Sequence, residues 1–351
     1  MVMKVDELRS ILKDYSADDV RKVLVAVYKA IPKKVKEERG IDALINNPNP
    51  PKNAAASKTR KKPAEVDPDL VVFDTQDFVS NAEDQNYFAP NRIVPKKKRS
   101  NWRFEAKGLY RNLLLAKAST ADPPLLQDAA KALESLYGVL CRGCAYHLFA
   151  TTYTFEAMKV PQTEFFEQLL AAKFSVLHGR DFTDWAVKAV VDHELHYDVV
   201  RTDLCRVLIE FLRTAELREL ALESCAQEIG RCKTTAKRKR EPMSFGLPDG
   251  HYRSNELAVL GYMLCAALGE FERGVEFFHK HYKDDRDIPL YVLSRMLLNS
   301  KQRELITREF EAAEQRGIKP RENLKLLYDI AKSGAPLPDA IPIAHRAARS
   351  P

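Results

Sequence analysis

The sequence lacks a hydrophobic run long enough to cross a membrane. Its longest apolar stretch, residues 257–268, is twelve residues long, whereas a transmembrane helix needs about 20. The start of the chain contains no apolar signal core, and Asp6, Glu7 and Asp14 argue against an acid-poor transit peptide. We therefore expect a protein without membrane contact, located in the cytoplasm.

The signatures of common catalytic sites are absent as well. The chain contains no G-x-S-x-G, no G-x-x-x-x-G-K and no G-x-G-x-x-G after a strand. These patterns position a nucleophilic serine, a nucleoside triphosphate and a dinucleotide, respectively. We name no catalytic residue and no cofactor, and an enzyme is the minority interpretation.

Cysteine is scarce, with six residues in 351. They are spread through stretches with helical periodicity, and no secretion signal precedes them, so we expect reduced and mostly buried thiols. The positions are Cys141, Cys144, Cys205, Cys225, Cys232 and Cys265.

What the sequence has in abundance is apolar residues spaced three and four apart, which predicts an all-α fold. No run of alternating strands is visible. Residues 70–99 are the least regular part: residues 71–73 fit either a short strand or one helical turn, and the prolines that follow favour extended chain. The expected helices after this part are 102–118, 123–148, 162–178, 184–196, 198–213, 215–232, 251–268, 271–282, 288–299, 301–316, 321–333 and a further candidate at 339–348.

The composition divides the chain into three parts. Residues 1–47 form a helical hairpin, in which Ser16 caps the second helix and Pro32 ends it. This hairpin resembles the start of an uncharacterised bacterial family, a resemblance that implies no chemistry. Residues 48–100, rich in Pro and in charge, read as a partly extended linker, and residues 101–351 as the helical body.

Residues 255–334 of the body show repeat-like helical hairpins. Their turns fall near Gly269, Ser300 and Gly334, at separations of 31 and 34 residues, close to the ~34-residue period of helical solenoid repeats. The stretch LGEFERGVEFFHKHY resembles a tetratricopeptide repeat, because Gly269 fits its turn and Phe271 fits an aromatic position.

Phe278 fits a second aromatic position of that repeat, whereas Gly274 and His281 depart from it. The stretch EAAEQRGIKP followed by YDIAKSG is similar to the join between two pentatricopeptide units. The resemblance implies a solenoid-like body with an extended binding surface. Any antiparallel helical pair with a glycine turn gives part of the same match.

Two clusters have metal-ligating side chains. Cys141, Cys144 and His147 lie in CRGCAYH, but on one helix they cannot converge unless Gly143 breaks it. His193, Glu194 and His196 lie in DHELHYD, without the four-residue histidine spacing of a metalloprotease. Buried helix thiols and a polar helix end are the favoured interpretations, so we predict no metal ligands.

Basic residues cluster in residues 52–62, 92–111 and 231–240. The second and third clusters are candidates for contact with an anionic partner. Residues 92–111 carry eight basic side chains against Glu105, interleaved with aromatic rings, and residues 231–240 carry six. Cations that neutralise phosphates, next to rings that stack on bases, are typical of single-strand binding. The candidate nucleic-acid-binding residues are Lys96, Lys97, Lys98, Arg99, Trp102, Arg103, Lys237, Arg238, Lys239 and Arg240.

The alternative for the aromatic residues is structural: Trp102, Phe104 and Tyr110 would anchor the first helix of the body in its core. Residues 65–84 supply seven acidic and no basic side chains, so the charges can also neutralise one another within the chain. We expect a helical-repeat binding or adaptor protein that recognises a macromolecular partner, a protein or a nucleic acid (RNA or DNA). The alternatives are a metal-dependent enzyme built on one of the Cys/His or His/Glu clusters, and a scaffold with self-neutralising charge.

Overall fold

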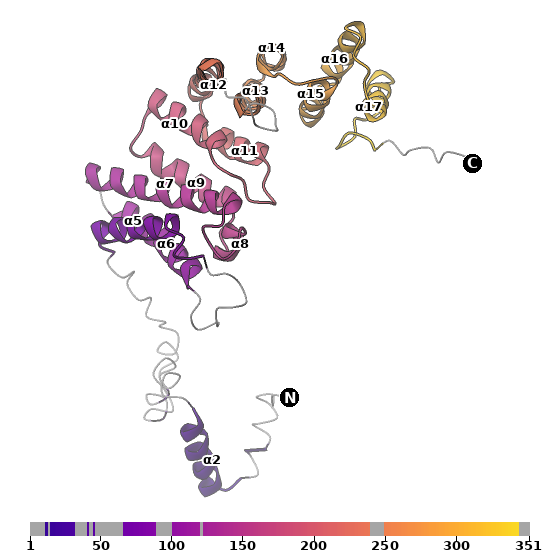
Figure 1. The fold of residues 1–351 in the computed structure, drawn as a ribbon. Coiled ribbons are helices and arrows are strands. Elements are labelled where there is room, and N and C mark those ends of the chain that lie inside the picture. Colours follow the sequence, from indigo (N-terminus) through magenta and orange to yellow (C-terminus); the bar gives the residue numbers. More distant parts are fainter. Residues whose placement is uncertain are drawn as a thin grey trace. The chain divides into compact units, whose positions relative to one another are not determined.

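The computed structural model describes residues 11–12, 15–31, 41, 45, 66–88, 100–119, 122–238 and 249–343, without the side chains of residues 30, 233–238 and 249–251 (Figure 1). Throughout these ranges all regular structure is helical, with fourteen helices and no strand. The all-α prediction is confirmed. The chain divides into two compact units, Met1–Glu65 and Val66–Pro351.

The first unit contributes one long described helix, α2 (Ala17–Ala30). Ser16 caps it as expected, because its Oγ accepts a hydrogen bond from the Asp19 backbone N–H at 3.2 Å. Four apolar side chains of α2, Val23, Leu24, Val25 and Val27, are exposed. The rest of the predicted hairpin lies mostly outside the described residues.

The second unit begins with a helix inside the segment that the sequence assigned to a linker. α5 (Pro68–Glu83) starts with Asp67 at the N-cap, whose carboxylate accepts hydrogen bonds from two backbone N–H groups of the first turn. Its buried residues include Val71 and Phe78. Residues 71–73 are therefore part of a long helix and not of a strand, since this stretch packs on the helices that follow.

Those helices are α6 (Trp102–Ser119) and α7 (Pro123–Ala145), and α5, α6 and α7 all contact one another. Trp102 enters the core at the start of α6, with its ring centroid 4.3 Å from that of Phe149. Phe78 and Tyr87 stack on the same aromatic cluster. The aromatic cluster holds this end of the unit together.

Ten further helices follow in the described part of the second unit. They are α8 (Thr154–Met158), α9 (Gln162–Phe174), α10 (Gly179–Asp192), α11 (Arg201–Phe211), α12 (Ala215–Arg238), α13 (Asp249–Ala267), α14 (Phe271–His281), α15 (Ile288–Asn299), α16 (Arg303–Gln315) and α17 (Glu322–Lys332). α9 ends four residues before the predicted 178, and α10 begins at Gly179, whose φ is +49°, five residues before the predicted start at 184. Residues 339–343, part of the last candidate helix, are not helical.

Helices of the second unit pack mainly on close neighbours in the sequence. α7 packs on α9, α9 on α11, and α11 on α13, while α10 packs on α12 and α15 on α16 (Figure 1). A large core runs from α5 to α13, and a second core joins α13 to α17. α5, α7, α9, α11 and α13 thus stand side by side in this order.

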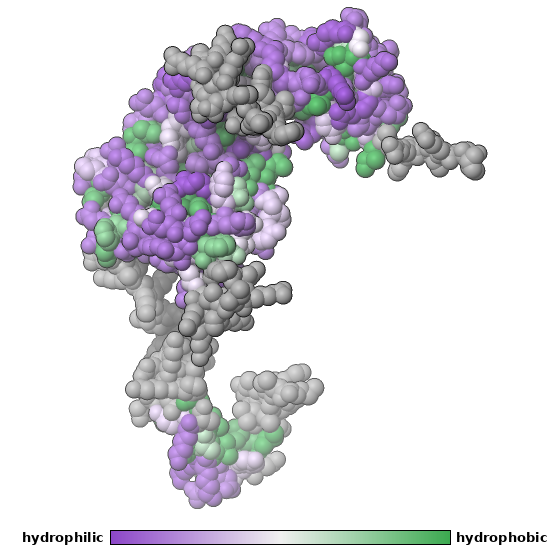
Figure 2. All heavy atoms as spheres, in the orientation of Figure 1, coloured by the Kyte–Doolittle hydropathy of each residue, from purple (hydrophilic) through white to green (hydrophobic). Residues whose placement is uncertain are grey.

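The surface is mostly polar. On the face seen in Figure 2, hydrophilic residues cover most of the described surface of the second unit, and hydrophobic residues gather in scattered patches. Within the described ranges, no helix is both long enough and apolar enough to span a membrane.

Candidate binding groove

Most of the basic residues expected to bind nucleic acid lie where the structure gives no side chain. Lys96, Lys97, Lys98 and Arg99 are outside the described residues, as are Lys239 and Arg240, and of Lys237 and Arg238 only the helical backbone in α12 is described. The structure therefore places two members of that set, Trp102 and Arg103.

These two residues have different surroundings. Trp102 is 4% exposed, so its ring is buried in the aromatic cluster and presents no face to a base. Tyr110 is buried as well, whereas Phe104 is 63% exposed. The Arg103 guanidinium lies over the Phe104 ring at 4.7 Å, a cation–π contact. Of the residues weighed for stacking, the Arg103–Phe104 pair is the one at the surface.

Cys141, Cys144 and His147 do not converge. α7 continues through Gly143 to Ala145, and burial raises the pKa of the Cys141 thiol. Cys144 lies 3.2 Å from the Thr154 hydroxyl and 3.5 Å from the Leu140 carbonyl oxygen. His147 is exposed beyond the helix end, beside Phe88.

The second cluster is spread around a helix end. α10 ends at Asp192, which pairs with Arg253, and burial lowers the pKa of His193. His196 is buried, and its Nδ1 contacts the Asp198 carboxylate. Among the described residues, no group of three or more His, Cys, Asp or Glu side chains is placed to hold a metal ion.

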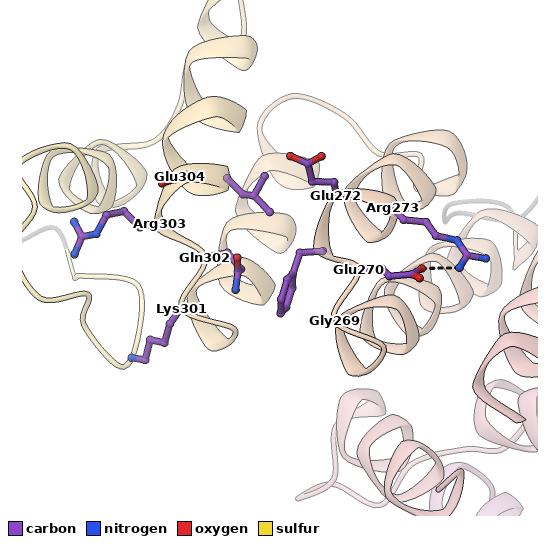
Figure 3. Close-up of a pocket in the computed structure, with 10 residues that line it drawn as sticks. Gly269, Glu270, Glu272, Arg273, Lys301, Gln302, Arg303 and Glu304 are labelled. Carbon is purple, nitrogen blue, oxygen red and sulfur yellow. Dashed lines mark hydrogen bonds and ion pairs between the residues drawn. The ribbon is translucent and has the colours of Figure 1, made fainter. Parts of the chain in front are cut away.

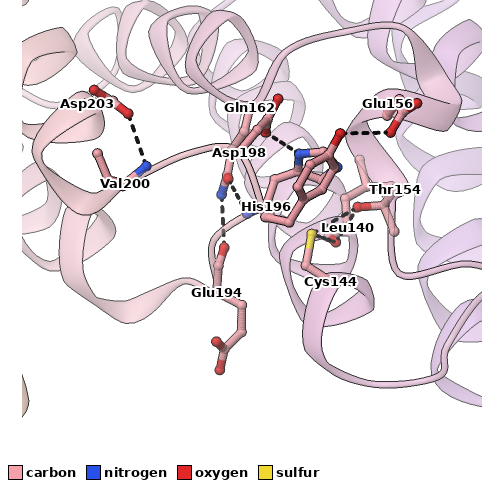
Figure 4. Close-up of polar contacts among 11 residues, drawn as sticks. Leu140, Cys144, Thr154, Glu156, Gln162, Glu194, His196, Asp198, Val200 and Asp203 are labelled. Carbon is pink, nitrogen blue, oxygen red and sulfur yellow. Dashed lines mark hydrogen bonds and ion pairs between the residues drawn. The ribbon is translucent and has the colours of Figure 1, made fainter. Parts of the chain in front are cut away.

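A residue that the sequence did not single out, Gln162, organises this region (Figure 4). Its amide N–H group donates to the Glu194 carbonyl at 2.9 Å and the Tyr137 hydroxyl at 3.2 Å, and its amide oxygen accepts from the His196 backbone N–H at 2.8 Å. Gln162 is 1% exposed. It therefore fixes the loop between α10 and α11 against α7 and α9, and with it the position of His196.

The fixed loop forms one wall of an open hollow of about 810 Å³, which we call the α9–α11 hollow. Its other walls are α8, the first turn of α9 and one face of α11. Its lining residues are Phe155, Glu156, Lys159, Val160, Pro161, Gln162, Thr163, His196, Asp198, Val199, Asp203, Arg206, Val207 and Glu210.

A second hollow of about 420 Å³, the α13–α15 hollow, lies on the other side of α11. It is more apolar than the first, because the half-buried Ile209 and Met263 and the buried Met296 line it. Its lining residues are Val200, Thr202, Arg206, Ile209, Glu210, Tyr262, Met263, Ala266, Arg295, Met296, Asn299 and Ser300.

The two hollows meet at α11. Arg206 and Glu210, one turn apart on this helix, line both of them. Together they make a surface that follows α8, α9, α11, α13 and α15, which we call the binding groove. An extended chain lying across the odd-numbered helices would contact both hollows.

Buried polar contacts hold the walls of this groove in place. The Arg201 side chain donates to the carbonyl oxygens of Val190 at 2.6 Å and His193 at 2.8 Å, and its Nε donates to Glu256 at 3.0 Å. The Arg201 and Glu256 side chains are 13% and 10% exposed. The end of α10, the start of α11 and the side of α13 are thereby linked through one guanidinium group.

A third hollow of about 840 Å³ lies between the turns that join α13 to α14 and α15 to α16 (Figure 3). Most of its charged side chains have partners among the described residues. Arg273 pairs with Glu219 and Glu270, Arg303 donates to the Ile330 carbonyl, and Lys301 pairs with Asp339. This hollow offers a ligand few free charges.

No protein-family model, no curated protein and no solved structure matches the chain.

Proposed function

We propose that this chain is a helical-repeat binding or adaptor protein that recognises a macromolecular partner along the binding groove. The single observation that carries the proposal is the join of the two hollows at α11, through Arg206 and Glu210. A surface shared by successive helical pairs suits an extended ligand, as in helical solenoids. Small-molecule sites are, by contrast, concave pockets that bury most of their ligand.

A protein partner is favoured over a nucleic acid at this surface because its charges are mixed. The carboxylates of Glu156, Asp198, Asp203 and Glu210 face three cations. Phosphate binding depends on clustered Lys and Arg, and carboxylates beside them oppose it. The basic residues 96–99 and 231–240 support a nucleic-acid partner on sequence grounds, at a different place on the chain.

The test is affinity purification from a native lysate, split into nuclease-treated and untreated halves. The bait is compared with a variant whose α13–α15 hollow is filled by Val200→Glu and Asn299→Trp, two exposed lining positions. A control carries Leu326→Glu and Gln315→Trp, which are exposed positions outside the groove.

We expect a discrete protein partner that survives nuclease, is lost with the groove variant and is retained by the control. Retention by the groove variant would contradict the proposal. If the partners vanish with nuclease and nucleic acid co-purifies, the basic segments become the binding site. Replacing Lys96, Lys97, Lys98 and Arg99 by Ala would then flatten the salt dependence of binding, because the slope counts neutralised phosphates.

A further inference from the structure

Among the described residues, the side chains that line the α9–α11 hollow carry more negative than positive charge. Four carboxylates line it, against the two cations Lys159 and Arg206. Arg206 is already paired with Asp203 at 2.7 Å. Glu210 is exposed and makes no hydrogen bond or ion pair within the described residues.

Two further carboxylates, those of Glu156 and Asp198, also retain free hydrogen-bond acceptor sites. Glu156 is exposed and accepts one weak hydrogen bond, from the Tyr197 hydroxyl at 3.4 Å. The Asp198 side chain is 59% exposed although it contacts His196. A carboxylate has about four acceptor sites on its two oxygens, so each of these groups can still accept from a ligand cation.

Two exposed aromatic rings lie next to these carboxylates. Tyr153 is 51% exposed and Tyr197 is 68% exposed, and their ring centroids are 4.9 Å apart in an edge-to-face arrangement. A Tyr ring face attracts a guanidinium or ammonium group, and the attraction adds to that of a nearby carboxylate. Exposed rings beside carboxylates that retain free acceptor sites are thus suited to an Arg or Lys side chain.

A buried ring nitrogen in the same hollow also lacks a partner. His196 lines the hollow and is 4% exposed, and its Nε2 has no hydrogen-bond partner among the described residues. Its Nδ1 contacts the Asp198 carboxylate. In the neutral tautomer with the proton on Nδ1, Nε2 would be an acceptor, and an N–H group of a ligand would complete its hydrogen bonding.

The other end of the groove has different chemistry. Ile209, Met263 and Met296 give the α13–α15 hollow an apolar floor, and the exposed Arg295 stands at its edge. Methionine side chains adapt to ligands of different shape. This hollow fits an aliphatic side chain of a ligand whose cations lie in the α9–α11 hollow.

We propose that the binding groove holds an extended, basic segment of a partner protein. Its Arg or Lys side chains meet Glu156, Glu210 and the Tyr153–Tyr197 pair, and an aliphatic side chain enters the α13–α15 hollow. The proposal rests on the proposed function and adds the chemistry of the ligand. The excess of carboxylates excludes a phosphate backbone from this position, because phosphate and carboxylate repel each other.

The experiment is a fluorescence-anisotropy titration of the full chain with three probes. The first is a short labelled peptide in which arginine alternates with leucine and serine, the second has glutamate in place of arginine, and the third is single-stranded RNA of similar length. The variants are Glu156→Gln with Glu210→Gln in the groove, and Glu276→Gln with Glu314→Gln as the control. All four glutamates are exposed, and the control pair lies on α14 and α16, outside the groove.

We expect the arginine peptide to bind and the glutamate peptide not to bind. The groove variant should raise the Kd about three- to tenfold and flatten its salt dependence, since two screened ion pairs are lost. The control pair, with the same change of net charge, should alter the Kd less than about twofold.

Equal binding of the two peptides, equal effects of the two variants, or binding of RNA that competes with the peptide would each overturn the inference. The groove-filling variant of the lysate experiment distinguishes failure of the basic-segment inference from failure of the proposed binding function. If that variant loses its partner but the arginine peptide does not bind, the groove binds a partner of other chemistry. If the arginine peptide does not bind and the groove-filling variant still retains the lysate partner, the proposed function fails too.

Discussion

At the scale of single residues, Arg201 links three of the elements around the groove, α10, α11 and α13. Its guanidinium satisfies two carbonyl oxygens at the end of α10 and pairs with Glu256 on α13. A buried pair contributes little net stability, but removing one partner leaves a buried charge alone. Replacing one partner alone therefore lowers the free energy of unfolding by more than the net contribution of the pair.

We predict that Arg201→Met lowers the free energy of unfolding by about 3–5 kcal/mol. Glu256→Gln should cost less, since Arg201 keeps its two carbonyl partners. The double variant, Arg201→Met with Glu256→Gln, should lose less free energy of unfolding than the two single losses added together, because it contains neither of the two charges. Urea unfolding of the four proteins measures the coupling, and strictly additive effects would argue against it.

Individual residues were also the level at which the sequence was least informative. Trp102 could be a stacking platform or a core anchor from its spacing alone, and its 4% exposure became known with the fold. Gln162 gave no sequence signal, because a glutamine at the start of a helix is ordinarily solvated. Its role depends on partners up to 34 residues away in the sequence.

At the scale of elements, the contact between α13 and α14 depends on glycine. A Cβ built on Gly261 would meet three carbons of the Phe277 ring within 2.9 Å. On the facing helix, a Cβ on Gly274 would lie 3.1 Å from the Tyr262 ring. Gly274, which departs from the tetratricopeptide pattern, thus has a packing reason of its own.

We predict that Gly261→Ala lowers the free energy of unfolding by about 1–3 kcal/mol, the usual cost of overpacking a core. Gly230→Ala is the matched control. Gly230 lies in α12, and its added Cβ would meet nothing within 4 Å. Alanine there should stabilise the protein by about 0.5–1 kcal/mol through helix propensity. Thermal unfolding of both variants gives the comparison, and a neutral or stabilising Gly261→Ala would mean that Phe277 moves aside freely.

Most helices of the body could be predicted, because their apolar spacing and caps are local properties of the sequence. α14 and α15 begin where the sequence placed them, and α15 also ends there. α5 was missed since two of its four buried positions are Thr75 and Ala82, which weaken the apolar stripe. The Asp67–Pro68 cap was the signal that could have found it.

At the scale of the whole molecule, the groove could not be predicted from the sequence. Its lining residues come from positions 155 to 300, and helical periodicity does not say which helices stand side by side. The local charge of the groove also could not be predicted from the net charge of the sequence. The chain has a formal net charge of +7, yet the α9–α11 hollow holds more carboxylates than cations. The net charge of the chain therefore attracts or repels a partner at long range, whereas the carboxylates of the groove interact with a partner that is already bound.

This difference gives a kinetic prediction for the variant in which Lys96, Lys97, Lys98 and Arg99 are replaced by Ala. A basic peptide is repelled by the positive chain before it reaches the groove, so removal of four positive charges should speed its association a few-fold at low ionic strength. Dissociation, which depends on contacts in the groove, should be unchanged. Stopped-flow anisotropy over a range of ionic strengths measures both rates. The difference in association should disappear in about 1 M salt, where the screening length is about 3 Å. Slower association or faster dissociation would instead place residues 96–99 among the contacts with the partner.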